Sequence, residues 1–340
     1  MLDFLSTPTA IFIIETLIKC LLVLAIFASL AGFATYLERK VLGWFHRRPG
    51  PWMAGPQGLL QIVPDMIKLF TKEDIIPYEA NKIVFKVAPL VAAIAAFTAL
   101  AAVPILPEFK IFGHVVRPII ADINVGILYV MGCSSLTAYS IFLGGMSSGN
   151  KWALLGGARM VVSFISYEAI AAMSIVCVVM LTGSLSLVDI NNYQSEGLTS
   201  WIIFKQPLGF ILFVIALFVE TNRTPVCLCE NDPELVAGYG TEYSGLRWGM
   251  FFIGEYAAMI TGAVLISLIY LGGFNDFYFI PGALAMLGKI CFVFFWYFWA
   301  RGAFPHLRAD QIMTTCYLIL TPVAGLNLIV TACVVLWSMS

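Results

Sequence analysis

The chain has 340 residues, of which 60% are hydrophobic and only 11% are charged. Soluble domains carry about 25% charged residues, so this composition excludes a water-soluble fold. The net charge of -1 gives no bulk attraction to nucleic acid, and no basic run is interleaved with aromatic residues as a strand-binding groove requires. We therefore expect an all-α, polytopic membrane protein with no nucleic-acid partner.

Eight apolar stretches are long enough to cross a bilayer, which takes roughly 20 apolar residues for about 30 Å of hydrocarbon. The first has no basic region before it and no small-residue cleavage site after it, so we expect a retained span. We expect residues 1–340 to form one membrane domain, with spans at Ile11–Tyr36, Ile83–Val103, Ile123–Leu143, Arg159–Leu181, Trp201–Glu220, Trp248–Leu271, Ile280–Ala300 and Thr314–Leu336. An even number of spans returns both termini to one side.

The loops differ in their content of lysine and arginine, which accumulate on the cytoplasmic side of a membrane. The richer set of loops and loop edges contains Arg39, Lys40, Arg47, Arg48, Lys68, Lys72, Lys82, Lys151, Arg159, Arg223, Arg247, Arg301 and Arg308. The opposite set contains Lys110, Arg117 and Lys205. This asymmetry predicts that both termini lie outside and that the long connections Leu37–Lys82 and Thr221–Arg247 are cytoplasmic.

An amphipathic helix is expected within the first long connection. Apolar residues between Leu59 and Phe70 fall on one stripe at helical periodicity. The opposite face holds Gln61, Asp65, Lys68 and Lys72. Such a helix lies at the membrane surface, and Pro64 predicts a kink or a start just before Asp65. Periodicity alone leaves open whether this helix contacts a ligand or is an ordinary surface helix.

Two carboxyl groups fall near the middle of expected spans, where ionisable groups are costly and mark a pathway or a partner. Glu168 lies nine residues past Arg159 and Glu255 lies seven past Trp248, about 10–14 Å into their helices. Because an apolar medium disfavours the charged carboxylate, such groups can take and release protons near neutral pH. A proton relay is the functional interpretation, and a neutral acid bonded to a neighbouring helix is the structural alternative.

Further acids are concentrated in the second long connection and at the ends of the adjoining spans. They are Glu220, Glu230, Asp232, Glu234 and Glu242, and Glu255 follows in the next span. A solvated surface is the ordinary explanation for a run of charge. Because this run is continuous with intramembrane acids, we favour an acidic funnel that leads into the bilayer. Glu15 and Lys19, four residues apart, are explained by an i,i+4 salt bridge.

The residue patterns give no sign of a metal ion or a prosthetic group held by this chain. Cys227 and Cys229 are separated by one residue, which is too close for the CxxC spacing of zinc or redox sites. The three histidines are isolated, and phosphate-loop and haem-attachment motifs are missing. Any redox cofactor is therefore expected on another chain. The lack of an internal repeat disfavours a secondary carrier.

Several motifs follow one another along nearly the whole sequence. They are Glu38–Gly43, Gly55–Gln61, Asp65–Asp74, Ile165–Glu168, Glu220–Pro225, Glu234–Tyr239 and Glu242–Gly245. In this order they resemble the quinone-site membrane subunits of respiratory complex I, the proton-translocating NADH:quinone oxidoreductase, a family that includes mitochondrial NADH dehydrogenase subunit 1. Together the motifs are far more specific than any one of them.

The resemblance implies a subunit at the heel of the membrane arm that docks the peripheral arm and forms much of the quinone chamber. The positions that match the chamber are Glu38, Arg39, Asp65, Lys68 and Glu73. The positions that match the acidic path toward the proton-pumping subunits are Glu168, Glu220, Glu230, Asp232, Glu234, Glu242 and Glu255. Tyr167, Arg223, Arg301 and Arg308 are expected to support them.

The resemblance also implies the cofactors, the partners and the location. Quinone would be the substrate, while NADH, FMN and iron–sulfur clusters would be bound only by partner subunits. The partners would be the quinone-site subunits of the peripheral arm, adjacent small membrane subunits and the lipid bilayer. The chain would span the bacterial inner membrane, or the mitochondrial inner membrane if it is organellar. No residue by itself distinguishes ubiquinone from menaquinone.

Four positions depart from the family pattern. Cys227 stands where the family usually has an acid, Trp52 where it usually has Asn, and His306 where it usually has Arg. A Gln that is common before the Ser-Tyr-Glu motif is also replaced, near Ser163. These changes bear on loop conformation, quinone preference and the donor partner. Two other functions remain open at this point: the equivalent anchor of a related membrane-bound hydrogenase or of a quinone reductase with another donor, and a stand-alone proton-coupled carrier.

Overall fold

A computed structural model describes residues 8–104, 109–111, 114–116, 119–223, 237–275, 280–305 and 307–339. Within these ranges the chain is dominated by helices, which confirms the expected all-α polytopic class. A short antiparallel hairpin, β1 (Phe109–Ile111) with β2 (His114–Val116), interrupts the connection between the second and third expected spans. No sequence pattern predicted these two strands.

The helices follow the expected spans in order. The long ones are α2 (Pro8–Phe45), α4 (Lys82–Ala99), α5 (Gly126–Ser147), α6 (Lys151–Thr182), α9 (Pro207–Glu220), α11 (Gly245–Ile269), α12 (Gly282–Ala303) and α14 (Thr321–Met339). The short ones are η1 (Pro56–Gln61), α3 (Ile62–Thr71), η2 (Leu100–Ala102), α7 (Leu187–Tyr193), η3 (Leu198–Ser200), α8 (Ile202–Lys205), η4 (Gly238–Gly240), α13 (Ala309–Thr315) and η5 (Cys316–Leu320). Seven helical segments of the described chain are long and apolar enough to cross a membrane, and α9 is a shorter apolar helix.

Two helices are longer than the apolar runs that predicted them. Helix α2 continues past Tyr36 to Phe45, and α6 begins at Lys151 instead of Arg159. The start of α6 is fixed by Asn150, whose side chain accepts a hydrogen bond of 3.0 Å from the backbone of Trp152. A span predicted from hydropathy ends at the first charged residue. The helix itself can continue further, because long basic side chains can reach water beyond the membrane surface.

The expected span Trp201–Glu220 is not one helix. It is divided at Gln206 into α8 and α9, and Pro207 stands at the first position of α9. Proline lacks a backbone N–H and its ring crowds the preceding turn, so it begins a helix easily but does not continue one. The break leaves α9 with 14 residues, shorter than a typical span.

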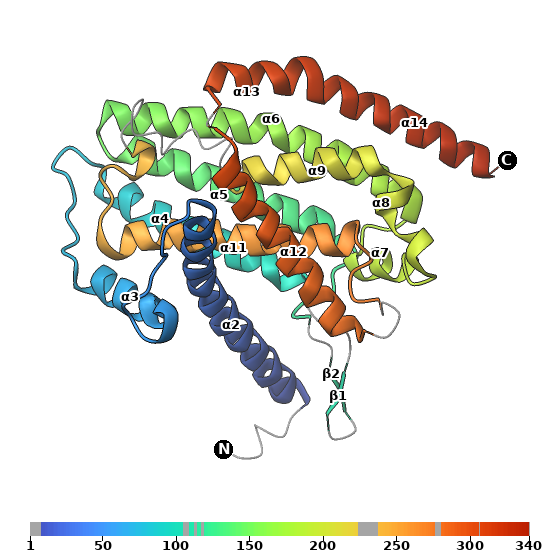
Figure 1. The fold of residues 1–340 in the computed structure, drawn as a ribbon, viewed down its shortest axis with the longest axis horizontal. Helices are drawn as coiled ribbons and strands as arrows, with labels where there is room; N and C mark the ends of the chain where they lie inside the picture. The colour runs from blue at the N-terminus through green and yellow to red at the C-terminus, as the bar shows by residue number, and fades with distance from the viewer. Residues whose placement is uncertain are drawn as a thin grey trace.

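The helices pack in layers around α6 and α11. Helix α6 contacts α5, α9 and the α13–α14 segment, while α11 contacts α4, α2, α12 and α3. Figure 1 shows α13 and α14 along one edge of the bundle beside α6, with α2 and α3 on the opposite side. Small residues allow close approach, as at Gly156, where a Cβ atom would lie 2.8 Å from the Cα of Gly238.

The amphipathic segment forms η1 and then α3, which begins at Ile62. Pro64 lies in the first turn of α3, where the missing N–H has no helical acceptor, so no kink results. Val63, Ile67 and Phe70 are exposed on the outer side of this helix. An apolar outer face of this kind fits a helix at the membrane surface.

Candidate functional site

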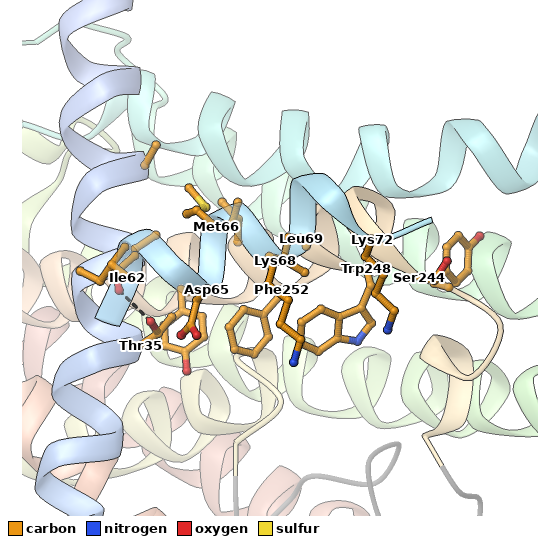
Figure 2. A pocket seen from close by; sticks show the side chains of 18 of the residues that line it. Thr35, Ile62, Asp65, Met66, Lys68, Leu69, Lys72, Ser244, Trp248 and Phe252 are labelled. Carbon is orange, nitrogen blue, oxygen red and sulfur yellow. Dashed lines mark hydrogen bonds between the residues drawn. The ribbon is translucent and has the colours of Figure 1, made fainter. Parts of the chain in front are cut away.

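A cavity of about 390 Å³ lies between α2, α3 and α11. Helix α3 forms one wall, and Figure 2 shows Asp65, Lys68 and Lys72 on it opposite Trp248 and Phe252. The lining residues of this chamber are Ala28, Ala31, Gly32, Thr35, Arg39, Ile62, Asp65, Met66, Lys68, Leu69, Lys72, Gly240, Tyr243, Ser244, Gly245, Trp248, Gly249, Phe252, Ile253 and Tyr256. The volume and mixed lining suit a small organic ligand.

Small residues on the long helices make room for α3 beside this cavity. A Cβ atom on Gly32 of α2 would lie 3.3 Å from Ile62, and one on Gly249 of α11 would lie 3.3 Å from Leu69. Any larger side chain at these two positions would press against α3. The glycines therefore set how closely α3 can cover the cavity.

Three aromatic residues of α11 form one wall of the cavity. Trp248, Phe252 and Tyr256 follow at intervals of four residues, which places them on one helix face. The rings of Trp248 and Phe252 stack with centroids 4.9 Å apart, and Phe252 meets Tyr256 edge-on at 4.8 Å. Sequence reasoning missed Trp248 and Phe252, although the spacing of four was a usable signal.

Charged side chains of α2 and α3 form the opposite, polar part of the wall. Arg39 and Asp65 form an ion pair of 2.7 Å, and Gln61 donates a hydrogen bond of 3.1 Å to the same carboxylate. Among the expected chamber residues, Arg39, Asp65 and Lys68 line the cavity. Glu73 is exposed outside the lining, and its backbone oxygen accepts a hydrogen bond from Ser244.

Glu38, also expected in the chamber, lies one layer behind the aromatic wall. Its Oε2 accepts a hydrogen bond of 2.8 Å from the hydroxyl of Tyr256, and its Oε1 pairs with Arg223 at 3.1 Å and with Arg301. The guanidinium of Arg223 also lies over the ring of Tyr256, 4.4 Å from its centroid. This Glu38 cluster joins α2, α11, α12 and the chain after α9.

Tyr243 closes the end of the cavity near α4. Its ring stacks on Phe85 with centroids 4.1 Å apart, and its hydroxyl donates to the Phe85 backbone oxygen at 3.2 Å. Burial raises the pKa of Tyr243, and the hydrogen bond with Ser147 and the charge of Arg247 oppose this shift without cancelling it. Tyr243 therefore stays a neutral hydrogen-bond donor at this end.

A second group of sites surrounds Glu220 at the end of α9. Glu220 lines three small cavities, of about 10, 20 and 20 Å³. The first is shared with Glu168, and the second with Glu255. Glu220 therefore lies between the other two acids in space, sharing one cavity with Glu255 of α11 and another with Glu168 of α6. Each cavity has roughly the volume needed for one water molecule.

Hydroxyl groups accompany these acids. Ser134, Thr137 and Ser140 of α5 line the cavities around Glu220, and Tyr239 donates a hydrogen bond of 2.9 Å to Glu255. Water with such hydroxyls can form a chain of donors and acceptors between carboxyl groups. Sequence reasoning missed the hydroxyl residues of α5, although their spacing of three was visible.

The remaining expected residues divide into three groups. Tyr167 lines the Glu168 cavity, and Arg223 and Arg301 belong to the Glu38 cluster. Glu242 accepts from Asn150 at 2.8 Å beside an open surface pocket, and Arg308 pairs with exposed Asp310, so these two lie apart from the acids. The residues that fall outside the described ranges are Glu230, Asp232, Glu234, Cys227 and His306.

The other two departures from the family pattern can be placed. Trp52 is 62% exposed, with the ammonium of Lys40 over its ring at 5.0 Å. Ser163 is buried and donates to the backbone oxygen of Arg159 at 3.1 Å. Across the described part of the chain, no three His, Cys, Asp or Glu residues are grouped as a metal ion would require.

A family model and individual relatives both match this chain over most of its length. The model of the NADH dehydrogenase family matches residues 18–332. An NADH-quinone oxidoreductase subunit of Campylobacter jejuni serotype O:2 is 65% identical over 327 residues, which are 96% of this chain and 98% of the relative. The corresponding subunits of Campylobacter curvus and Campylobacter hominis are 59% and 55% identical, over 94% and 96% of this chain and 97% and 98% of their own lengths.

Proposed function

The chain belongs to the NADH dehydrogenase family, and we propose that it is the membrane subunit of a proton-translocating NADH:quinone oxidoreductase that forms much of the quinone chamber. We further propose that it couples quinone reduction to proton pumping through its intramembrane carboxyl groups. One observation carries this proposal. Tyr256 lines the large cavity, while its neighbour Glu255 lines a cavity shared with Glu220, so one turn of α11 borders both regions.

The chamber has the properties that a quinone head group requires. An aromatic ring can lie against Trp248 and Phe252, and the charged groups of Arg39 and Lys68 can donate hydrogen bonds to quinone oxygens. The open apolar surroundings of α3 provide a route from the bilayer for an isoprenoid tail. The chain supplies the chamber wall and is not catalytic alone, because NADH, FMN and iron–sulfur clusters belong to partner subunits in this proposal.

The Glu38 cluster is the connection between chemistry and proton transfer. Reduction of quinone consumes protons and changes the charge of the chamber beside Tyr256. Tyr256 shares a hydrogen bond with Glu38, and two arginines hold that carboxylate. A change of charge at this cluster alters the field at Glu255, from which protons pass through Glu220 to Glu168 and on to neighbouring pumping subunits.

The same proposal sets the surroundings of the chain. It is a membrane protein, and in the proposal it spans the bacterial inner membrane, or the mitochondrial inner membrane if it is organellar, with both termini outside. Its partners in the proposal are the quinone-site subunits of the peripheral arm, adjacent small membrane subunits and the lipid bilayer. Purification as an independent monomer or homodimer with transport activity would support a stand-alone carrier instead.

A photoreactive quinone analogue tests the chamber. In the assembled complex, we expect the label on α2, α3 and the Trp248–Tyr256 face of α11, mapped by mass spectrometry of peptides. Phe252→Ala should weaken labelling because it removes part of the aromatic wall. Phe292→Ala is the matched control, because Phe292 is 61% exposed on α12 and does not line the cavity. Labelling confined to other helices would contradict the assignment.

A further inference from the structure

The last transmembrane segment is not a regular α-helix. Between α13 and α14 the residues Cys316–Leu320 form a π-helical turn, in which the backbone N–H of Thr321 bonds to the oxygen of Cys316. The hydroxyl of Thr321 donates to the same oxygen at 3.0 Å. The next residue is Pro322, which has no N–H to continue an α-helix and crowds the carbonyl of Leu318. The sequence Thr-Pro therefore explains the wide turn, and such turns occur frequently at functional sites.

This π turn is bonded to α6 at the residues just before Glu168. The hydroxyls of Ser166 and Tyr317 share a hydrogen bond of 2.8 Å, and the thiol of Cys316 donates to the Ser166 backbone oxygen at 3.3 Å. The hydroxyl of Tyr167 reaches the backbone oxygen of Ile312 at 3.5 Å. Between transmembrane helices, polar bonds of this kind replace the hydrophobic driving force that water would supply.

Glu168 lies on the other side of the same helix. Successive residues of an α-helix are about 100° apart, so the side chains of Ser166 and Glu168 leave α6 in nearly opposite directions. Tyr167 stands between them and lines the small cavity that Glu168 shares with Glu220. The π turn therefore holds one face of α6 while the opposite face carries the acid.

We propose that Tyr317 is a positioning residue for Glu168, because the π turn fixes the rotation and height of α6 through Ser166. The inference rests on the proposed proton path. Conversion of the π turn to α-helical geometry moves its contacts by one residue, which is about 1.5 Å along the axis and about 100° around it. The Ser166–Tyr317 bond is then lost, and Glu168 turns away from Glu220. The last helix thereby sets whether the two acids share water.

Two variants and one control test this role in the assembled complex. Tyr317→Phe removes only the hydroxyl. Deletion of Leu318, an exposed residue (72%), removes the extra residue that widens the π turn, and α14 keeps the same face toward α6. Tyr139→Phe is the control, because Tyr139 is 60% exposed on α5. In each case the rate of decylubiquinone reduction by NADH and the quenching of a pH-sensitive acridine dye are measured with the complex in vesicles.

We expect both variants to lower protons pumped per quinone reduced and to shift the pH profile of pumping, while Tyr139→Phe changes neither. Loss of one such hydrogen bond shifts the balance between two helix arrangements by about fivefold. An assembled deletion variant with an unchanged ratio and pH profile overturns the proposal, as does a parallel fall of reduction and pumping in Tyr317→Phe. Glu168→Gln is measured alongside: if it pumps normally, the proton path itself fails, whatever the Tyr317 result.

Discussion

The chamber between α2, α3 and α11 and the cavities around Glu220 differ in size, cover and chemistry. The chamber measures about 390 Å³ and is covered by α3, whereas each Glu220 cavity measures about 20 Å³ or less and lies among long helices. The Arg39–Asp65 pair in the chamber is 50% and 33% exposed, so water reaches it. One region has room for an organic ring, and the other has room for single water molecules.

The two regions share one helix, α11, which lines cavities of both. Along α11, Trp248, Phe252 and Tyr256 face the chamber, while Glu255 faces the acids. Glu38 stands where the two regions come closest, bonded to Tyr256 and to two arginines. A mutation at the junction should therefore affect both regions, whereas mutations within either region should separate quinone reduction from proton transfer.

Loss of the junction should have the largest effect. Glu38→Ala leaves the buried Arg223, whose side chain is 7% exposed, and the partly exposed Arg301 without their shared carboxylate. Breaking a buried ion pair such as that of Arg223 costs roughly 3–5 kcal/mol. We expect a marked loss of assembled complex and a lower melting temperature, measured by the yield of purified complex and by its thermal unfolding. Glu196→Ala, at an exposed position, is the matched control. Normal yield and melting of Glu38→Ala would show that the two regions are not joined through this residue.

Within the acid region, Glu220→Gln keeps the shape of the side chain but removes the proton that can be exchanged. Positioned acids and bases contribute about 100-fold or more to proton transfer, so we expect pumping to fall by about that factor while quinone reduction continues. Dye quenching and NADH oxidation in vesicles measure the two. Reductase activity and pumping at wild-type levels would refute the acid path.

The sequence predicted the helices well because long apolar runs must be helical in a bilayer, where every backbone N–H and C=O needs an internal partner. It placed α11 and α12 within a few residues. It did not foresee the break before α9, although Gln206–Pro207 was a visible signal. Charged residues at a span end also hid the true start of α6, because hydropathy does not record a capping residue such as Asn150.

The family resemblance named residues that the fold brings to the cavity, but it did not reveal the long-range contacts among them. Arg39 and Asp65 were expected to line a quinone chamber, and both line the cavity beside α3; that this cavity holds quinone stays a prediction. Glu38 pairs with Arg223 and Arg301, which are 185 and 263 residues away in the chain, and no spacing rule reveals such contacts. Glu242 adjoins the acidic run in sequence, but the fold directs it to Asn150.

Filling the chamber should have a moderate effect confined to quinone chemistry. Gly249→Leu places a side chain where a Cβ alone already meets Leu69 at 3.3 Å, and overpacking costs about 1–3 kcal/mol. We expect the KM for decylubiquinone to rise about tenfold, with the ratio of protons to electrons unchanged. Gly288→Leu is the control, because a Cβ at Gly288 meets nothing within 4 Å. A changed pumping ratio in Gly249→Leu would erase the distinction between the regions.

The smallest effect should come from the Arg39–Asp65 pair, and its size reports how wet the chamber is. Exposed ion pairs contribute only about 0.2–1 kcal/mol, because water screens the charges. A double-mutant cycle with Arg39→Ala and Asp65→Ala, read from the KM for decylubiquinone, should give a coupling of about 0.5–1 kcal/mol, since bound quinone would exclude part of that water.

The same cycle on Arg308 and Asp310, which are 69% and 62% exposed, should give nearly no coupling. Equal coupling in both cycles would mean that no ligand covers the Arg39–Asp65 pair, and α3 would then be a surface helix without a chamber behind it.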